Sequence, residues 1–228
     1  MANASINLGN GNWSVKESKL LGSRPIKDKI APIEFDVTRA STATRVNKQG
    51  LIETVNSNIA RIDYSNDANG SLLLEPQSTN LINYSEDFSQ SAWFNSKGRI
   101  IIGNNSIIAP NGTLTGTKLT STNENNAHYL RNGTASYSDG VSRTFSIFLK
   151  YGNENKNIKI SYLNKTLLVN FNANGVLNYV SNTSQSYNIE EYESGWYKVS
   201  VTDTVSGGGF LYTGIQTENN QDGTSFFY

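Results

Sequence analysis

The alternation of apolar and polar positions predicts a chain built from short β-strands. Phe145, Ile147 and Leu149 share one face of the segment 143–151, and residues 196–201 alternate in the same way. From residue 77 onward such segments recur at short intervals, separated by turn signals such as APNGT, RNGT and NANG. No long amphipathic helix interrupts them. Strands at this spacing indicate an all-β sandwich or jelly roll rather than βαβ units.

A smaller β unit precedes the sandwich, at residues 35–76. The segments ATRV and LIETV flank NKQG, a polar turn that ends in Gly, so we expect a hairpin. ARIDY alternates and leads through the turn SNDANG into SLLLEP, a strand that stops at Pro76. A hairpin of this size is marginal alone. We therefore interpret residues 35–76 as a hairpin adaptor or oligomerisation module.

Residues 1–34 show no clean period. Single apolar residues stand among turn residues and two prolines, and an extended arm cannot bury such residues by itself. We expect the arm to lie on another surface, with a disordered leader as the alternative. The expected anchors of this docking arm are Trp13, Leu20, Leu21, Ile26 and Ile30.

Composition narrows the function classes. The 228 residues carry 19 basic and 19 acidic side chains, which argues against nucleic-acid or membrane-surface binding through a general basic field. Cys is absent, so disulfides and thiol chemistry are excluded. Asn is frequent, at roughly one residue in seven, as expected for many turns. The final SFFY has the pattern of an apolar strand, from which we expect the polypeptide to continue beyond residue 228.

Residues with catalytic or ligand-binding chemistry are sparse. His128 is the only histidine and lies in a strand pattern, so we expect it to be structural. The adjacent acids of Glu86–Asp87 and of the turn 188–197 are expected to point to opposite faces and cannot flank one glycosidic bond. No cofactor or metal ligand spacing is present, although loop oxygens leave a structural calcium open. The segment from Ser85 predicts a capped helical turn with Phe88 and Trp93 turned inward, and Trp93 and Trp196 are expected in the core. The candidates for stacking on sugar rings are Tyr129, Tyr151, Tyr162 and Tyr179.

One set of motifs resembles a known family. The set consists of RASTAT at 39–44, GLI at 50–52, RIDY at 61–64, LLEPQSTNL at 73–81, SEDF at 85–88 and AW at 92–93. In this order they resemble a module common in fibre, spike and host-attachment proteins of tailed-bacteriophage particles. The segments APNGT, TFSIFLKYG and SGWYKVSVT look like that family's carbohydrate-binding-like jelly roll. Ala60 departs from the family, which often has Pro there.

The resemblance implies a non-enzymatic virion protein. Its fold would be an extended N-terminal arm (1–34), a hairpin adaptor (35–76) and a jelly roll (77–228) that projects from the particle. It would be a homotrimer, a head fibre or capsid decoration made in the host cytoplasm and carried on the virion surface. Its partners would be capsid or tail proteins. Candidate oligomer-interface residues are Arg39, Arg45, Arg61, Asp63 and Tyr64.

Three functions remain open from the sequence. The first is this structural head fibre. The second is a tail fibre or a glycan-binding adhesin module, in which the sandwich grips a host-surface polysaccharide for host attachment. The third is an accessory domain of a polysaccharide-degrading enzyme, which would require two carboxylates facing each other across a cleft at about 5–10 Å.

Overall fold

The computed structural model describes residues 14–16, 19–26, 29–34, 36–126, 128–137, 140–152, 157–162, 165–184, 186–204, 209–217 and 225–227. Of residues 14–34, 96, 134–137, 162, 209–217 and 225–227 it describes the backbone alone. The chain divides into two compact units, Met1–Thr79 and Asn80–Tyr228. The described elements are nearly all antiparallel strands, which confirms the all-β prediction.

Residues 14–34 differ from the extended arm predicted for this region. They form an antiparallel sheet of β1 (Ser14–Lys16), β2 (Lys19–Ile26) and β3 (Lys29–Glu34). The two prolines that argued against strands are compatible with this sheet. Pro25 lies in β2 beyond the reach of β1, which pairs only with Lys19–Leu21, and Pro32 lies on the edge strand β3. A strand position with a free edge tolerates the missing N–H of proline.

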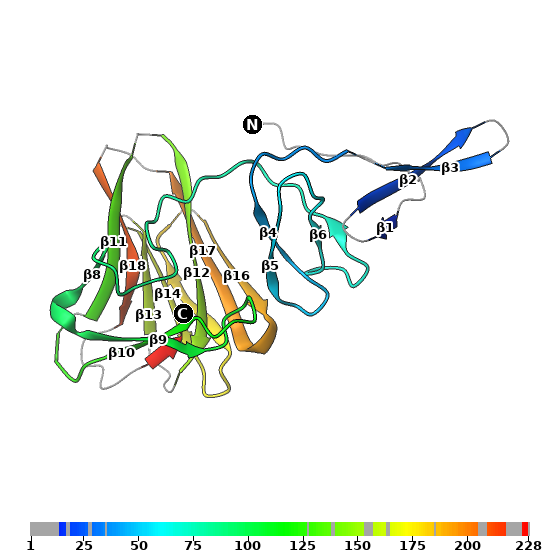
Figure 1. The fold of residues 1–228 in the computed structure, drawn as a ribbon. Helices are drawn as coiled ribbons and strands as arrows, with labels where there is room; N and C mark the ends of the chain where they lie inside the picture. The colour runs from blue at the N-terminus through cyan, green and yellow to red at the C-terminus, as the bar shows by residue number, and fades with distance from the viewer. Residues whose placement is uncertain are drawn as a thin grey trace. The chain divides into compact units, whose positions relative to one another are not determined.

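The predicted hairpin is present in residues 36–79. β4 (Ala43–Val46) pairs with β5 (Ile52–Val55), as Figure 1 shows, and β6 (Ile62–Asp63) pairs with β7 (Ser71–Leu72). Ile62 and Ala60 form the buried centre of this part, with Val37, Tyr64 and Leu72 packed against them. We call residues 36–79 the hairpin module.

Residues 80–228 form two six-stranded antiparallel sheets that share one apolar core (Figure 1). Sheet 1 has the order β16-β17-β12-β19-β10-β9, and sheet 2 the order β15-β14-β13-β18-β11-β8. The strands of sheet 1 are β9 (Ile100–Ile107), β10 (Gly116–Ser121), β12 (Ser142–Tyr151), β16 (Ser186–Tyr192), β17 (Trp196–Thr204) and β19 (Ser225–Phe227). Those of sheet 2 are β8 (Trp93–Asn95), β11 (His128–Tyr137), β13 (Asn157–Tyr162), β14 (Lys165–Phe171), β15 (Leu177–Asn182) and β18 (Gly209–Thr217). Two 3-10 turns, η1 (Ser96–Gly98) and η2 (Glu193–Gly195), join strands.

Alternation decides which side chains enter the core between the sheets. Phe145, Ile147 and Leu149 of β12 are buried, as their spacing predicts. Trp93 and Trp196 are also buried, as expected. Trp196 stands at an outward position of β17, where its indole Nε1 donates a hydrogen bond to the carbonyl oxygen of Ile108 at 3.1 Å. The core between the sheets therefore follows the period-2 pattern, and Trp196 is buried separately from this core.

A recurrent Asn-x-x-Gly turn accounts for part of the Asn content. The side-chain oxygen of Asn47 accepts hydrogen bonds from the backbone N–H of Gln49 and Leu51, both at 3.0 Å. Asn172 does the same for Asn174 and Val176. The glycine that closes each turn, at positions 50 and 175, has a φ of 77°. Only a residue without a Cβ adopts this conformation at little cost.

Two segments differ from their predicted structure. The residues before β17 were expected to form an exposed turn, but Ser186–Tyr192 is the edge strand β16, and the turn is confined to η2. The segment around Ser85 contains successive turns instead of a capped helical turn, with Asp87 accepting from the N–H and hydroxyl of Ser89. Phe88 and Trp93 do point inward, as predicted, and pack edge to face at 4.6 Å between ring centroids.

Candidate functional site

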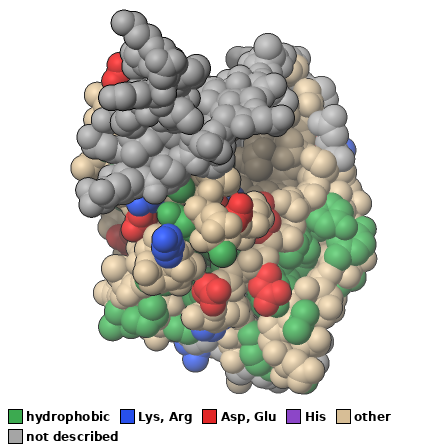
Figure 2. All heavy atoms as spheres, turned by 90° about the vertical axis from the view of Figure 1, so that its right-hand side faces the viewer, with side chains coloured by type: hydrophobic (Ala, Val, Ile, Leu, Met, Phe, Trp, Pro, Cys, Tyr) green, Lys and Arg blue, Asp and Glu red, His purple; other side chains and the backbone are tan. Residues whose placement is uncertain are grey.

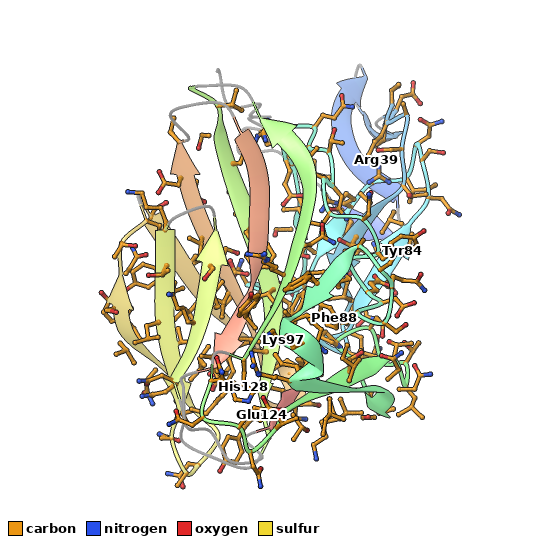
Figure 3. The ribbon with its side chains drawn as sticks, turned by 90° about the vertical axis from the view of Figure 1, so that its left-hand side faces the viewer. Arg39, Tyr84, Phe88, Lys97, Glu124 and His128 are labelled. Carbon is orange, nitrogen blue, oxygen red and sulfur yellow. The ribbon has the colours of Figure 1, made fainter. Side chains whose placement is uncertain are left out.

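Arg39 organises a loop within the hairpin module (Figure 3). Its Nη2 donates hydrogen bonds to the carbonyl oxygens of Val55 at 3.2 Å, Ile59 at 3.3 Å and Asn56. The backbone of Arg39 exchanges two more bonds with Asn58, which has a φ of 61°. The side chain that was predicted to contact another copy is therefore engaged inside its own unit.

Arg61 and Asp63 attach β6 to β4. The Nε and Nη2 atoms of Arg61 donate to the carbonyl oxygen of Thr44 at 2.9 and 2.6 Å, and its Nη1 lies 2.7 Å from a carboxylate oxygen of Glu75. Asp63 accepts from the N–H of Val46 at 2.8 Å. The backbone bond from Tyr64 N to Val46 O completes the join. The RIDY motif thus has an internal role that its sequence did not reveal.

The other two interface candidates are also engaged within the module. Arg45 forms an ion pair of 2.6 Å with Glu53, the residue directly opposite it on β5. Lys48 places its Nζ 5.5 Å from the ring centre of Tyr64. Contact of any of the five residues with a second copy of the chain stays a prediction. Of the docking-arm residues, Trp13 lies outside the described part, and for Leu20, Leu21, Ile26 and Ile30 only the strand backbone is described.

The tyrosines predicted to stack on sugars fall into different environments. Tyr151 packs partly buried against the core, edge to face with Phe171 at 5.9 Å. The side chain of Tyr162 lies outside the described part. Tyr179 stacks on Tyr187 with ring centroids 4.9 Å apart and an interplanar angle of 8°. Tyr129 lies on the outward face of a sheet, where its ring centre is 5.2 Å from the guanidinium of Arg131.

Phe94, Tyr129 and Arg131 form a cluster on the outer face of sheet 2, the sheet that Figure 3 faces. Phe94 lies on the edge strand β8 directly opposite Arg131 on β11. The two rings are stacked at 5.9 Å, and the Arg131 guanidinium lies 5.0 Å from the Phe94 centroid and 5.2 Å from that of Tyr129. We call these three residues the aromatic–arginine cluster. Cation–π contacts of this kind restrict the position of a guanidinium relative to the two rings.

The catalytic candidates His128, Asp87 and Glu190 each make contacts within the fold. His128 is fully buried at the start of β11, where its Nε2 lies 3.2 Å from the hydroxyl of Thr122 (Figure 3). Hydrogen bonds from Ser89, and then from Gln90, lower the pKa of Asp87. Glu190 and Glu191 stand on opposite faces of β16, as their adjacency predicts. Glu190 forms an ion pair with Lys198 at 3.8 Å. The pKa of Tyr197 is raised mainly by its own burial and then by the charge of Glu191.

The described residues contain neither a metal-binding cluster nor a membrane-spanning helix. Within those ranges, no group of three or more His, Cys, Asp or Glu side chains is placed to hold a metal ion. None of the helical segments described there is long and apolar enough to cross a membrane. On the face drawn in Figure 2, acidic and basic side chains lie among apolar and polar ones.

Sequence reasoning missed Phe94, Arg131 and Tyr187. Phe94 belongs to the short edge strand β8, whose position opposite β11 no local pattern encodes. The alternation around Leu130 could have identified Tyr129 and Arg131 as outward neighbours, because buried Leu130 and Asn132 take the inward positions.

The sequence matches no protein-family model. Comparison with the curated proteins also finds no match.

Proposed function

We propose that this chain is a structural protein of a tailed-bacteriophage particle, a fibre that its N-terminal region anchors to the head. The β-sandwich would project outward from the virion surface. The protein would act as a homotrimer without enzymatic activity, and its partners would be capsid proteins and, at its outer part, a host-surface polysaccharide.

The ordered set of motifs between residues 39 and 93 carries this proposal. In the structure these motifs have structural roles. Arg39 holds a loop by its carbonyl oxygens, Gly50 closes the hairpin, and Arg61 with Asp63 joins β6 to β4. Phe88 and Trp93 then pack into the sandwich core. A motif set that specifies a compact module, rather than a reaction centre, supports a structural role.

The strand order gives a second line of support. Eight central strands have the order β10-β19-β12-β17 in sheet 1 and β11-β18-β13-β14 in sheet 2. We infer from this order a jelly roll with one extra strand at each end of each sheet. This topology is used widely in capsid and lectin-like domains, so it suits a projecting virion domain.

A glycan-binding adhesin module is the second candidate function, and the aromatic–arginine cluster favours it. Its aromatic rings lie on the outer face of one sheet, where Phe94 is half exposed and can stack on a sugar ring. This role is compatible with the first, since one chain can anchor and bind. A tail-fibre location and an accessory domain of a polysaccharide-degrading enzyme are the remaining alternatives.

Deletion of residues 1–30 tests the anchoring role. The truncated chain should be produced folded, because the hairpin module and sandwich keep their own buried centres. It should be missing from purified particles when it replaces the full chain in the infected host. A Tyr187→Ala chain, altered far along the sequence from the arm, is the matched control and should be incorporated at the unaltered level. Normal incorporation of the truncated chain would refute anchoring by this region.

A further inference from the structure

Two tyrosines face each other at one edge of the sandwich. Tyr179 lies on β15, an edge strand of sheet 2, and Tyr187 lies on β16, an edge strand of sheet 1. Their rings are almost parallel, with an interplanar angle of 8° and ring centroids 4.9 Å apart. Stacked rings touch at a spacing of about 3.5–4 Å between their faces, so this centroid separation means that the rings overlap with an offset. The two phenols are therefore in direct contact, one from each sheet.

The presence of two phenols distinguishes this contact from the other ring contacts of the chain. Among the described side chains, every other stacked or edge-to-face pair contains a phenylalanine, whose partner is a tryptophan or a tyrosine. A phenol gives up one electron far more readily than the ring of phenylalanine does. Within the described residues, Tyr179 and Tyr187 are thus the place where two oxidisable phenol rings lie against each other.

Both rings can be reached from solvent. Tyr179 is 49% exposed and Tyr187 is 41% exposed, whereas the easily oxidised Trp93 and Trp196 are only 6% and 1% exposed. The sequence contains no Cys, whose thiol would reduce a tyrosyl radical, and a single Met. An oxidant in solution therefore meets these phenols more easily than it meets the described tryptophans. A radical formed on either ring has no thiol of the same chain to quench it.

We propose that Tyr179 and Tyr187 form a site of oxidative cross-linking, at which a one-electron oxidant joins the two side chains into dityrosine. Each phenol first gives one electron to the oxidant and its hydroxyl proton to water, which leaves two phenoxyl radicals. The radicals then combine through a carbon–carbon bond between two ring carbons, each of which lies next to a carbon that bears oxygen. Each bonded carbon finally loses its hydrogen as a proton, and each oxygen takes up a proton, which restores both aromatic rings.

The oxidant belongs to the class that haem peroxidases form from hydrogen peroxide. In the overall reaction the two tyrosines lose two electrons and two protons, and one hydrogen peroxide is reduced to two molecules of water. The unpaired electron of a phenoxyl radical occupies orbitals perpendicular to the ring plane, so the new bond begins to form between ring faces. A parallel, offset stack holds the two rings in this arrangement before they react, which replaces a chance encounter by a positioned one.

The product is a covalent bond between edge strands of the two sheets. An edge strand is paired on one side only, so the edge of a sandwich is less firmly held than its centre. Disulfides are excluded by the absence of Cys, and dityrosine is a covalent link that the residues of this edge do allow. The inference goes beyond the proposed function and does not depend on it, because it concerns the chemistry of the folded chain itself.

Oxidation of the folded full chain by a haem peroxidase and limiting hydrogen peroxide tests the proposal. We expect a monomer lighter by two hydrogen atoms, with the fluorescence of dityrosine. After proteolysis, fragment masses should place the new bond between Tyr179 and Tyr187. The bond should form about tenfold faster in the folded chain than in a synthetic peptide of residues 175–191, in which no sandwich positions the rings. The cross-linked monomer should also unfold at a higher temperature than the untreated chain, since the bond restricts the unfolded state.

Matched variants separate this site from general tyrosine oxidation. Tyr179→Phe and Tyr187→Phe each keep two rings at the edge but remove one phenol, so each should abolish the cross-link in the monomer. Tyr84→Phe is the control, since Tyr84 is 58% exposed and no ring contact is described for it. This variant should cross-link like the unaltered chain. Thermal unfolding before oxidation should show that all three variants are folded.

Three results would overturn the proposal. The first is an oxidised monomer without a bond between Tyr179 and Tyr187, including the case in which oxidation links separate chains instead. The second is a cross-link in the monomer of either Phe variant at the level of the unaltered chain. The third is coupling in the free peptide as fast as in the folded chain. None of these results bears on whether the chain is part of a particle, which the truncation tests separately.

Discussion

Asp63 shows how one buried carboxylate can hold two strands together. Burial by itself raises its pKa, but hydrogen bonds from the Ser65 hydroxyl, the Val46 N–H and the Ser65 N–H, together with the charge of Arg61, outweigh burial and lower the pKa overall. The folded chain therefore releases this proton more readily than the unfolded chain. Consequently the stabilisation is complete above the unfolded pKa, near 4, and is lost as the pH falls through that value toward the lower folded pKa.

Replacement of Asp63 by Asn should destabilise the hairpin module at neutral pH by about 1–3 kcal/mol, because an amide cannot accept all of these hydrogen bonds. It should also reduce the loss of stability between about pH 5 and pH 3. Denaturant unfolding at several pH values measures both effects. Asp36→Asn, at an exposed position, is the control and should change stability by less than about 0.5 kcal/mol. Equal acid sensitivity of the Asp63→Asn and unaltered chains would contradict the assigned role.

Gly70 is required by both its conformation and its surroundings. Its φ is +79°, and a Cβ there would lie 2.7 Å from the Ile62 side chain and 2.7 Å from the Tyr64 ring. The neighbouring groups are part of the module's buried centre and cannot move aside easily. The glycine of the SNDANG turn is thus a packing requirement as well as a turn residue.

Substitution of Gly70 by Ala should lower the free energy of unfolding by about 2–4 kcal/mol, from backbone strain plus overlap. Gly98 provides the matched control, since its φ is +73° and a Cβ added to it would meet no atom within 4 Å. Gly98→Ala should therefore cost only the backbone strain, about 1–2 kcal/mol. Urea unfolding of the two variants measures both losses in the free energy of unfolding. Equal losses in the two variants would mean that the contacts with Ile62 and Tyr64 are unimportant.

At the scale of elements, the sequence predicts best where one face of a strand is buried. The alternation in β12 identified a strand, and the Asn-x-x-Gly turns identified where strands end. The prediction failed for β16, because an edge strand pairs on one side only and its Ser, Asn and Glu residues look like a turn. It also failed for β1–β3, because the two prolines, which lie at strand positions with a free edge, made the segment look irregular.

The candidate site was only partly predictable for a related reason. Tyr129 was selected from residue type, but its neighbours Phe94 and Arg131 are brought to it by the pairing of β8 with β11. Such pairing joins segments more than thirty residues apart in sequence, and no local pattern encodes it. Likewise, the charges of RIDY suggested an interface because their partners on β4 are backbone groups, the Thr44 carbonyl oxygen for Arg61 and the Val46 N–H for Asp63, which no side-chain motif reveals.

The stack of Tyr179 and Tyr187 joins the edge strands of the two sheets. Tyr179 is paired with Val169 and Tyr187 with Val201, and both valines are fully buried. Residues directly opposite on paired strands point to the same face, so both tyrosines point toward the inner side. At the edge formed by β15 and β16 they remain 49% and 41% exposed. The stack therefore covers the open edge of the core.

A double-mutant cycle measures this coupling. Tyr179→Ala and Tyr187→Ala should each destabilise the sandwich, and together they should cost less than the sum, by about 0.5–1.5 kcal/mol. Additive losses, with no coupling above about 0.3 kcal/mol, would show that the stack does not join the sheets. Tyr84→Ala, at a strongly exposed loop position, combined with Tyr187→Ala should be additive and serves as the control pair.

At the scale of the whole chain, the structure combines a small sheet, a hairpin module and a two-sheet sandwich. The hairpin module uses its charged residues for internal contacts. The sandwich keeps an aromatic–arginine cluster on the outer face of one sheet. The hairpin module and the sandwich thus each have their own buried centre, which is compatible with the proposed role of a projecting particle protein.

The location of the chain in purified phage particles tests the central claim most directly. A cryo-electron microscopy reconstruction should contain the two-sheet sandwich at the head surface, in three copies around a threefold axis, with the N-terminal residues against the shell. Particles that are complete and infectious but contain no density and no peptide of this chain would contradict the account.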